Sequence, residues 1–86
     1  MLPFNEEWIS QNESLRIFTP NVFDEELKWH TDWEDRVIDV INENDWKFQF
    51  DNELPIQMKG RIIIEKGVWH RVIKGTSNLE IKITRI

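Results

Sequence analysis

Two histidines and an aspartate are the residues of this chain whose types and spacing best suit metal chemistry. His30 and Asp32 lie two positions apart, and His70 follows Gly67 by three residues. Residues i and i+2 of a strand project to the same side, so His30 and Asp32 can hold one ion together. Two imidazoles and a carboxylate suit Fe(II) and also bind Mn, Ni or Zn, with positions left open for water or substrate. We therefore predict a divalent metal site, provided that the fold brings His70 to the other two residues.

Five further polar residues are candidates for catalysis or for binding a ligand beside such an ion. Glu34 and Asp35 carry carboxylates that would act as a general base or orient the metal ligands. Arg36 and Gln49 would contact the substrate, and the arginine favours an anionic one such as a carboxylate, a phosphate or a nucleotide. Arg71 is a candidate for a further contact with the ligand.

Each of these predictions has a plainer structural alternative. A single histidine on a barrel strand is more often a hydrogen-bonded core or rim residue than a metal ligand. The acidic residues 32, 34 and 35 would form an ion-paired network in which Arg36 satisfies the carboxylates. Arg71, Lys74 and the segment Gly75-Thr76 would either cradle an anionic group or form a solvated basic rim. Both interpretations stay open for each cluster.

Short strands must position these residues. Apolar, often β-branched residues alternate with polar ones between turn signals, which is typical of strands. The pattern predicts strands over residues 14–19, 26–32, 36–41, 46–50, 54–58 and 61–65, a strand that carries His70, and a last strand over 79–86. About eight short strands at this spacing indicate an all-β barrel or sandwich.

Turn chemistry refines this pattern at four places. Residues 36–41 and 46–50 flank a polar turn cluster and form the clearest predicted hairpin. Gly67 permits the positive φ of a tight turn before the strand of His70. Residues 54–58 should lie at a sheet edge because Pro55 cannot donate to a ladder. Residues 5–10 begin with an N-cap candidate followed by two acids, which predicts a short N-terminal helix.

Two motifs resemble those of the cupin superfamily. The segment Glu65-Lys66-Gly67-Val68-Trp69-His70 is similar to the second cupin motif, proline-x-glycine followed by two residues and a histidine, with Glu65 in the place of the proline. The segment His30-Thr31-Asp32 resembles the first motif, histidine-x-histidine, with Asp32 replacing the second histidine. Cupins are double-stranded β-helices whose motif histidines bind a divalent metal, and they include isomerases, dioxygenases, and sugar-binding or storage proteins. The resemblance implies metal at His30, Asp32 and His70.

The resemblance covers roughly residues 15 to 86, and the chain departs from the family at a third position besides Glu65 and Asp32. The first cupin motif ends in a glutamate about four residues after its second histidine, and Arg36 stands there in this chain. A cation at that position repels a metal ion and lowers its affinity. Glu34 or Asp35 would replace the missing acid if the strand carries a bulge. The chain is expected to be one cupin-like domain over residues 1–86, with residues 1–14 as an N-terminal docking segment.

Composition and charge limit the expected cellular compartment and the classes of partner that the chain could bind. The chain of 86 residues fits one domain, and the lack of cysteine excludes disulfides and thiolate metal sites. Residues 1–54 hold 14 acids and 4 bases, whereas residues 55–86 hold 2 acids and 7 bases. A net charge of −5 argues against nucleic-acid binding, and we expect the two parts to complement each other in space. No apolar run could span a bilayer and no signal peptide is evident, so we expect a cytoplasmic protein without a membrane partner.

Two functions follow from these observations. In the first, a small cupin-like protein binds a divalent metal and a polar or anionic small molecule in the barrel mouth, with isomerase- or dioxygenase-type chemistry implied by the resemblance. In the second, a non-catalytic module binds a protein or ligand without metal, as small regulatory or viral accessory proteins do. Five tryptophans and five phenylalanines either line a pocket or a homodimer interface, or fill a thin core. A homodimer is expected under both.

Overall fold

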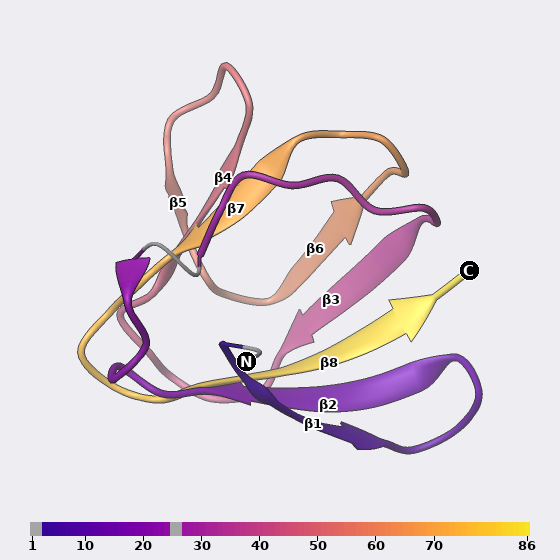
Figure 1. Cartoon of the computed structure of the whole chain (residues 1–86), viewed down its shortest axis with the longest axis horizontal. Coiled ribbons are helices and arrows are strands. Elements are labelled where there is room, and N and C mark those ends of the chain that lie inside the picture. The colour runs from indigo at the N-terminus through magenta and orange to yellow at the C-terminus, as the bar shows by residue number, and fades with distance from the viewer. Residues whose placement is uncertain (1–2, 25–26) are drawn as a thin grey trace.

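The computed structural model describes residues 3–24 and 27–86, which form an antiparallel β structure. Within these residues eight strands make two sheets, and no α-helix is present (Figure 1). The strands are β1 (Asn5–Trp8), β2 (Glu13–Phe18), β3 (Arg36–Val40), β4 (Lys47–Phe50), β5 (Ile56–Gln57), β6 (Arg61–Ile64), β7 (His70–Ile73) and β8 (Leu79–Arg85). The all-β prediction is confirmed.

The larger sheet has five strands in the order β1-β2-β8-β3-β6. Strand β8 lies at its centre and pairs with β2 on one side and β3 on the other. Its alternating sequence buries Leu79, Ile81 and Ile83 on one face, while Glu80 and Lys82 are only partly covered on the other. Because side chains alternate across a strand, this period-two pattern commits one face of the sheet to the core.

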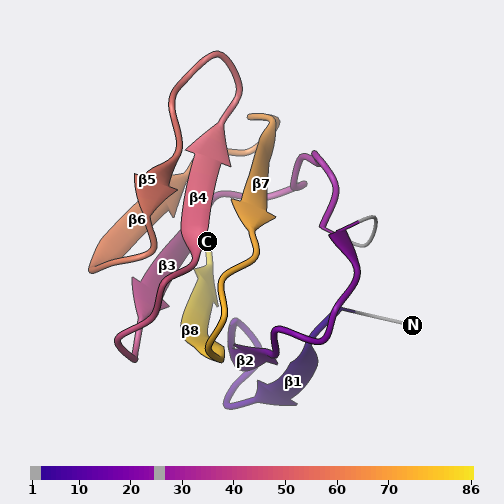
Figure 2. The same ribbon diagram turned by 90° about the vertical axis from the view of Figure 1, so that its left-hand side faces the viewer.

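The smaller sheet has the order β5-β4-β7, and it faces the larger one across the core. Figure 2 shows β4 and β7 above β8 and β2, with the chain between β2 and β3 running along the remaining side. Strand β5 lies at the edge of this smaller sheet, as the presence of Pro55 had led us to expect. The buried apolar side chains come from both sheets and from the loops between them: Phe18, Ile38, Trp46, Phe48, Met58, Ile62, Ile64, Leu79, Ile81 and Ile83.

The predicted hairpin between residues 36–41 and 46–50 is wrong, because β3 and β4 belong to different sheets. The polar residues between them also bind the β7–β8 loop and the start of β8. Asn42 donates to the carbonyl of Asn78 at 2.9 Å, and its side-chain oxygen accepts the Glu80 N–H at 2.9 Å. The cluster therefore carries the chain from one sheet to the other.

The predicted N-terminal helix is also wrong, since residues 5–8 form strand β1 at the edge of the larger sheet. Glu6 lies opposite Arg16 in the register of β1 and β2. Its carboxylate accepts hydrogen bonds from the Ser14 hydroxyl at 2.8 Å and from Arg16 Nε at 2.7 Å. Cross-strand partners for Glu6 therefore stabilise an extended conformation, where the sequence had indicated acids at a helix N-terminus.

The predicted strand over residues 26–32 is wrong in its described part, where only His30 makes a β-bridge. Residue 26 lies outside the described residues. The Leu27 N–H donates to the carbonyl of Asp24 at 3.0 Å, which bends the chain before it can pair as a strand. The segment therefore meets β7 at a single residue rather than along a ladder.

The acidic and basic parts of the sequence do interleave in space, as expected. Arg85 in β8 pairs with Glu6 and Glu34, and Lys82 pairs with Glu13 at 2.8 Å. Further ion pairs of the same kind join Arg61 to Asp39 and Lys74 to Asp24. The charge asymmetry along the chain thus becomes local pairing in the fold.

Candidate metal centre

One antiparallel bridge brings the two histidines together. The backbone N–H of His30 donates to the carbonyl of His70, and the His70 N–H donates back, both at 3.0 Å. Residues that face each other in this way present their side chains on the same side. The two rings accordingly lie with their centroids 4.3 Å apart. Two residues that are 40 positions apart in sequence therefore become immediate neighbours.

The turn before β7 completes the arrangement. Gly67 adopts a φ of 79°, a left-handed conformation that glycine takes without a steric penalty. Its N–H donates to the carbonyl of Asp32 at 3.0 Å. Asp35 accepts the Lys66 N–H at 2.8 Å from the same turn. The turn thus ties the segment of residues 30–35 to the start of β7, and the predicted role of Gly67 is confirmed.

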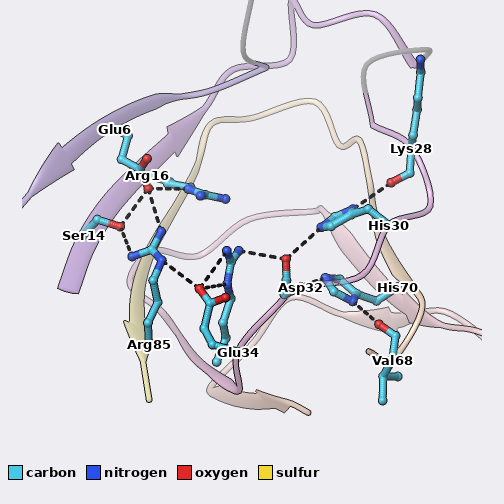
Figure 3. Close-up of polar contacts among 11 residues, drawn as sticks. Glu6, Ser14, Arg16, Lys28, His30, Asp32, Glu34, Val68, His70 and Arg85 are labelled. Atoms are coloured by element: carbon cyan, nitrogen blue, oxygen red, sulfur yellow. Dashed lines mark hydrogen bonds and ion pairs between the residues drawn. The ribbon is translucent and has the colours of Figure 1, made fainter. Parts of the chain in front are cut away.

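Backbone carbonyls set the orientation of both imidazoles (Figure 3). His30 Nδ1 lies 2.9 Å from the carbonyl oxygen of Lys28, and His70 Nδ1 lies 2.8 Å from that of Val68. A carbonyl only accepts, so the hydrogen of each neutral ring belongs on Nδ1 and the lone pair on Nε2. Metal-binding histidines are commonly held by such a hydrogen bond on the other ring nitrogen.

Asp32 is the point on which the two rings converge. His70 Nε2 lies 3.3 Å from Asp32 Oδ2, and His30 Nε2 lies 3.9 Å from Asp32 Oδ1. The side chains of Asp32 and His70 are almost fully buried, whereas that of His30 is half exposed. Burial raises the pKa of Asp32, but the interaction with His70 and the charge of Arg36 outweigh it and lower the pKa below 3.8. Asp32 is therefore ionised at neutral pH.

The donor set fits a divalent cation. Asp32 Oδ2 is buried and has no hydrogen-bond partner among the described residues. A protonated His70 places an Nε2–H toward this oxygen. A neutral His70 with its hydrogen on Nδ1 places a lone pair there instead, and the two atoms then repel unless a cation lies between them. Ligand atoms that share a Zn²⁺-sized ion stand about 2.9–3.5 Å apart. The three ligand atoms here lie within 4.8 Å of one another, so small side-chain movements would close the set.

A row of alternating charges extends from the candidate centre to β1 and β2 (Figure 3). Arg36 bonds Asp32 Oδ1 at 3.2 Å and Glu34 Oε1 at 3.2 Å. Arg85 joins Glu34 to Glu6, and Glu6 holds Arg16. The predicted ion-paired network is therefore present around Arg36, although Asp35 serves the Lys66 turn instead. Arg36 stands where it competes with a metal for Asp32.

A cavity of about 280 Å³ adjoins the three residues. Polar groups on its wall come from Arg16, Lys28, Arg36, Asp32 and the two histidines, and much of the rest is apolar: Phe4, Phe18, Leu27, Ile38, Phe48, Met58, Ile64, Val72, Ile81 and Ile83. This lining combines a few convergent polar groups with apolar walls, as small-molecule sites do.

Arg16 and Lys28 are charged cavity residues that the sequence analysis did not assign to a site. In the segment Ser14-Leu15-Arg16-Ile17-Phe18, the apolar Leu15 and Ile17 suggest an inward face. In the structure Ser14, Arg16 and Phe18 face inward instead: Ser14 and Phe18 are buried, and Ile17 is exposed. Arg16 and Phe18 are two positions apart on one strand and so project to the same side. An inward Phe18 would therefore have placed Arg16 on the core side.

Among the predicted ligand-contacting residues, only Arg36 lines the cavity. Arg71 Nε donates to Gln49 Oε1 at 2.9 Å, and the Arg71 guanidinium stacks 4.8 Å from the centre of the Trp29 ring. Gln49 follows the inward Phe48 on β4, so the pair lies on the outer face of the smaller sheet. The candidate bases are placed elsewhere as well, since Glu34 is bound by two arginines and Asp35 caps a turn.

The segment Gly75-Thr76 cradles an anion, but that anion is Asp45 of the same chain. Both carboxylate oxygens of Asp45 accept hydrogen bonds from the Thr76 N–H, and one accepts the Ser77 N–H at 3.2 Å. Hydrogen bonds from the Thr76 hydroxyl and from the backbone lower the pKa of Asp45 well below its usual range. Lys74 donates to the carbonyl of Val22. This cluster is therefore a structural clasp.

Solved structures with a similar fold cover nearly the whole chain. One is the protein NMB1881 of Neisseria meningitidis, with a TM-score of 0.60 and 16% identity over 96% of this chain and 81% of that protein. Another is a cupin-2 domain-containing protein of Shewanella frigidimarina, with a TM-score of 0.61 and 20% identity over 93% of this chain and 76% of that protein. No protein-family model and no curated protein matches the sequence. Among the described residues, no helix is long and apolar enough to cross a membrane.

Proposed function

We propose that this chain, which has a cupin-like fold, binds a divalent metal ion through His30 Nε2, Asp32 and His70 Nε2. The buried Asp32 Oδ2, which has no hydrogen-bond partner within residues 3–24 and 27–86 and faces His70 Nε2 at 3.3 Å, carries the proposal. The two carbonyls that fix Nδ1 of each ring support it, because they leave both Nε2 lone pairs directed at Asp32. Two nitrogens and an oxygen suit Fe, Mn, Ni or Zn.

The same proposal places a polar or anionic small molecule in the adjoining cavity. When bound, the ion would supply a Lewis acid for an oxygen of that molecule. Arg36 favours an anion, while Glu34 positions Arg36 and Asp35 holds the turn before His70. Isomerase- or dioxygenase-type chemistry is part of this proposal, to be assayed once the bound ion is known.

Calorimetric titration of chelator-treated protein with Mn²⁺, Ni²⁺ and Zn²⁺ tests the metal site. We expect one binding site per chain, and Asp32→Asn should weaken the affinity by more than about 100-fold because a charged ligand is lost. Asp39→Asn is the matched control, since Asp39 pairs with Arg61 on the neighbouring strands outside the cavity. Equal affinities for the wild type and Asp32→Asn would refute the site.

A second candidate function is the binding of another protein without metal, and exposed tryptophans favour it. Trp33 is 97% exposed, Trp8 is 54% exposed and Trp69 is 52% exposed. Apolar rings at the surface are typical of interaction sites, including those of homodimers. In this alternative Trp33→Ala lowers association in light scattering, whereas His70→Ala leaves it unchanged. The reverse order would favour the metal site as the functional centre.

A further inference from the structure

We propose that the cavity takes a small monocarboxylate with an apolar body, whose carboxylate is anchored by Arg16. This inference deepens the function proposed above, because it rests on the cavity beside the candidate metal centre being a ligand site. The inference assigns carboxylate binding to Arg16, which lies outside the metal cluster. Experiments can therefore refute the carboxylate site and the metal site independently.

The guanidinium of Arg16 is held with one edge available. Its Nε is used by Glu6 at 2.7 Å, and its centre stacks 4.0 Å from the centroid of the Phe4 ring. Neither Nη1 nor Nη2 donates a hydrogen bond to any described residue of the chain. Figure 3 shows this end of the side chain extending away from Glu6 toward the side of His30. A guanidinium fixed on two sides is preorganised to bind a carboxylate with its remaining edge.

The charges around Arg16 favour an anion over a neutral ligand. One carboxylate oxygen of Glu6 accepts hydrogen bonds from Arg16, Arg85 and Ser14, and Arg85 pairs with Glu34 as well. Arg16 therefore shares this acidic partner with two other donors. Arg36, the other arginine of the cavity, is used on both sides by Asp32 and Glu34. Arg16 is therefore the guanidinium with donors left for a ligand.

The rest of the cavity selects an apolar body of limited size. Phe18, Phe48, Ile81 and Ile83 line it, and they offer no hydrogen bonds to a sugar or a nucleotide base. Its volume of about 280 Å³ equals that of roughly nine waters, so about ten non-hydrogen atoms fill it. Octanoate has this size, while a nucleotide is larger and carries polar groups that the walls leave unpaired.

Calorimetry with octanoate, octanamide, acetate and AMP as probes tests the inference on metal-free and Zn²⁺-loaded protein. We expect octanoate to bind best. Octanamide should bind roughly tenfold more weakly because the charged hydrogen bonds are lost, and acetate more than about 100-fold more weakly because the apolar body is lost. Equal binding of octanoate and octanamide, or tighter binding of AMP, would overturn it.

The variant Arg16→Gln should weaken octanoate binding by roughly tenfold or more, and Arg16→Lys should fall between it and the wild type. Arg71→Gln is the matched control, because Arg71 bonds Gln49 on the outer face. Circular dichroism reports that the Arg16 variants are folded, and their Zn²⁺ affinity should stay unchanged. If octanoate binding survives Arg16→Gln but is lost in His70→Ala, the anchor is wrong and the metal proposal stands. If octanoate binds through Arg16 while no metal binds, the Arg16 anchor stands and the metal proposal is wrong.

Discussion

Asp32 is the residue for which two cations compete. Arg36 Nη1 lies 3.2 Å from Asp32 Oδ1 in the structure, on the carboxylate that a metal would share with the two histidines. A positive charge at this distance repels a divalent ion, although the effective dielectric of a partly solvated site weakens the effect. The departure from the first cupin motif at position 36 therefore has a direct electrostatic consequence.

Removing the charge of Arg36 should strengthen metal binding. We expect Arg36→Gln to tighten Zn²⁺ affinity by about tenfold in calorimetry, because the competing cation is lost while the ligands remain. Arg71→Gln removes the same charge from the outer face of the smaller sheet and should leave the affinity unchanged. Weaker binding in Arg36→Gln would mean that Arg36 holds Asp32 in its binding orientation.

Asp45 gives the clearest pH dependence at the residue scale. The pKa of its carboxyl is lowered from 3.8 in the folded chain by hydrogen bonds from Thr76 and Ser77. A lowered folded pKa contributes stability that is present above the unfolded value and is lost as the pH falls through the folded one. Below pH 3.8 the clasp therefore weakens progressively.

The variant Asp45→Asn isolates this effect. Its melting temperature should be lower than that of the wild type at pH 7, and the gap should narrow as both proteins are acidified below pH 3.8, because Asp45 of the unfolded wild type is then protonated while the folded form stays ionised. Thermal melts followed by circular dichroism between pH 7 and pH 2 measure this. A constant gap over the whole range would show that the charge of Asp45 does not stabilise the clasp.

At the scale of elements, β8 carries much of the core. Leu79 is fully buried on this central strand, whereas Ile63 on the edge strand β6 is 63% exposed. We expect Leu79→Ala to lower the free energy of unfolding by about 2–5 kcal/mol, through lost burial and the cavity left behind. Ile63→Ala should change it by less than about 1 kcal/mol. Urea denaturation measures both, and similar losses in the two variants would contradict the assigned core.

Elements whose side chains alternate strictly could be predicted from the sequence, and β8 is the clearest example. The segment of residues 26–32 alternates as well, yet among its described residues only His30 pairs, because a local backbone hydrogen bond from Leu27 to Asp24 bends the chain. The polar residues 42–45 predict a hairpin turn, because a local pattern does not show the long-range partners of Asn42, which are Asn78 and Glu80.

The site was predictable to the extent that motif spacing determines it. His30, Asp32 and His70 occupy positions of two known motifs, and the structure brings them together. Gln49 and Arg71 were placed in the site although they face outward, because the inward face of a strand depends on its pairing. Arg16 has no predicted site role for the same reason, because the inward face of residues 14–18 is set by the pairing of β2.

At the scale of the whole molecule, the candidate centre joins the segment before β3 to β7 through one bridge. A ligand that binds only the folded state stabilises it, by about 2.7 kcal/mol when its concentration is 100 times its dissociation constant. For a domain of this size such a gain raises the melting temperature by about 10–20 °C. We expect Zn²⁺ to produce this rise in the wild type and EDTA to reverse it. No rise in the wild type, or an equal one in His30→Ala, would contradict metal binding between these two segments.

The metal content of protein purified without a chelator tests the central claim most directly. Elemental analysis should find about one divalent ion per chain in the wild type and far less in His30→Ala and in His70→Ala, with both variants folded by circular dichroism. A wild-type protein without metal, or variants that retain the wild-type amount, would show that His30, Asp32 and His70 are not a metal centre.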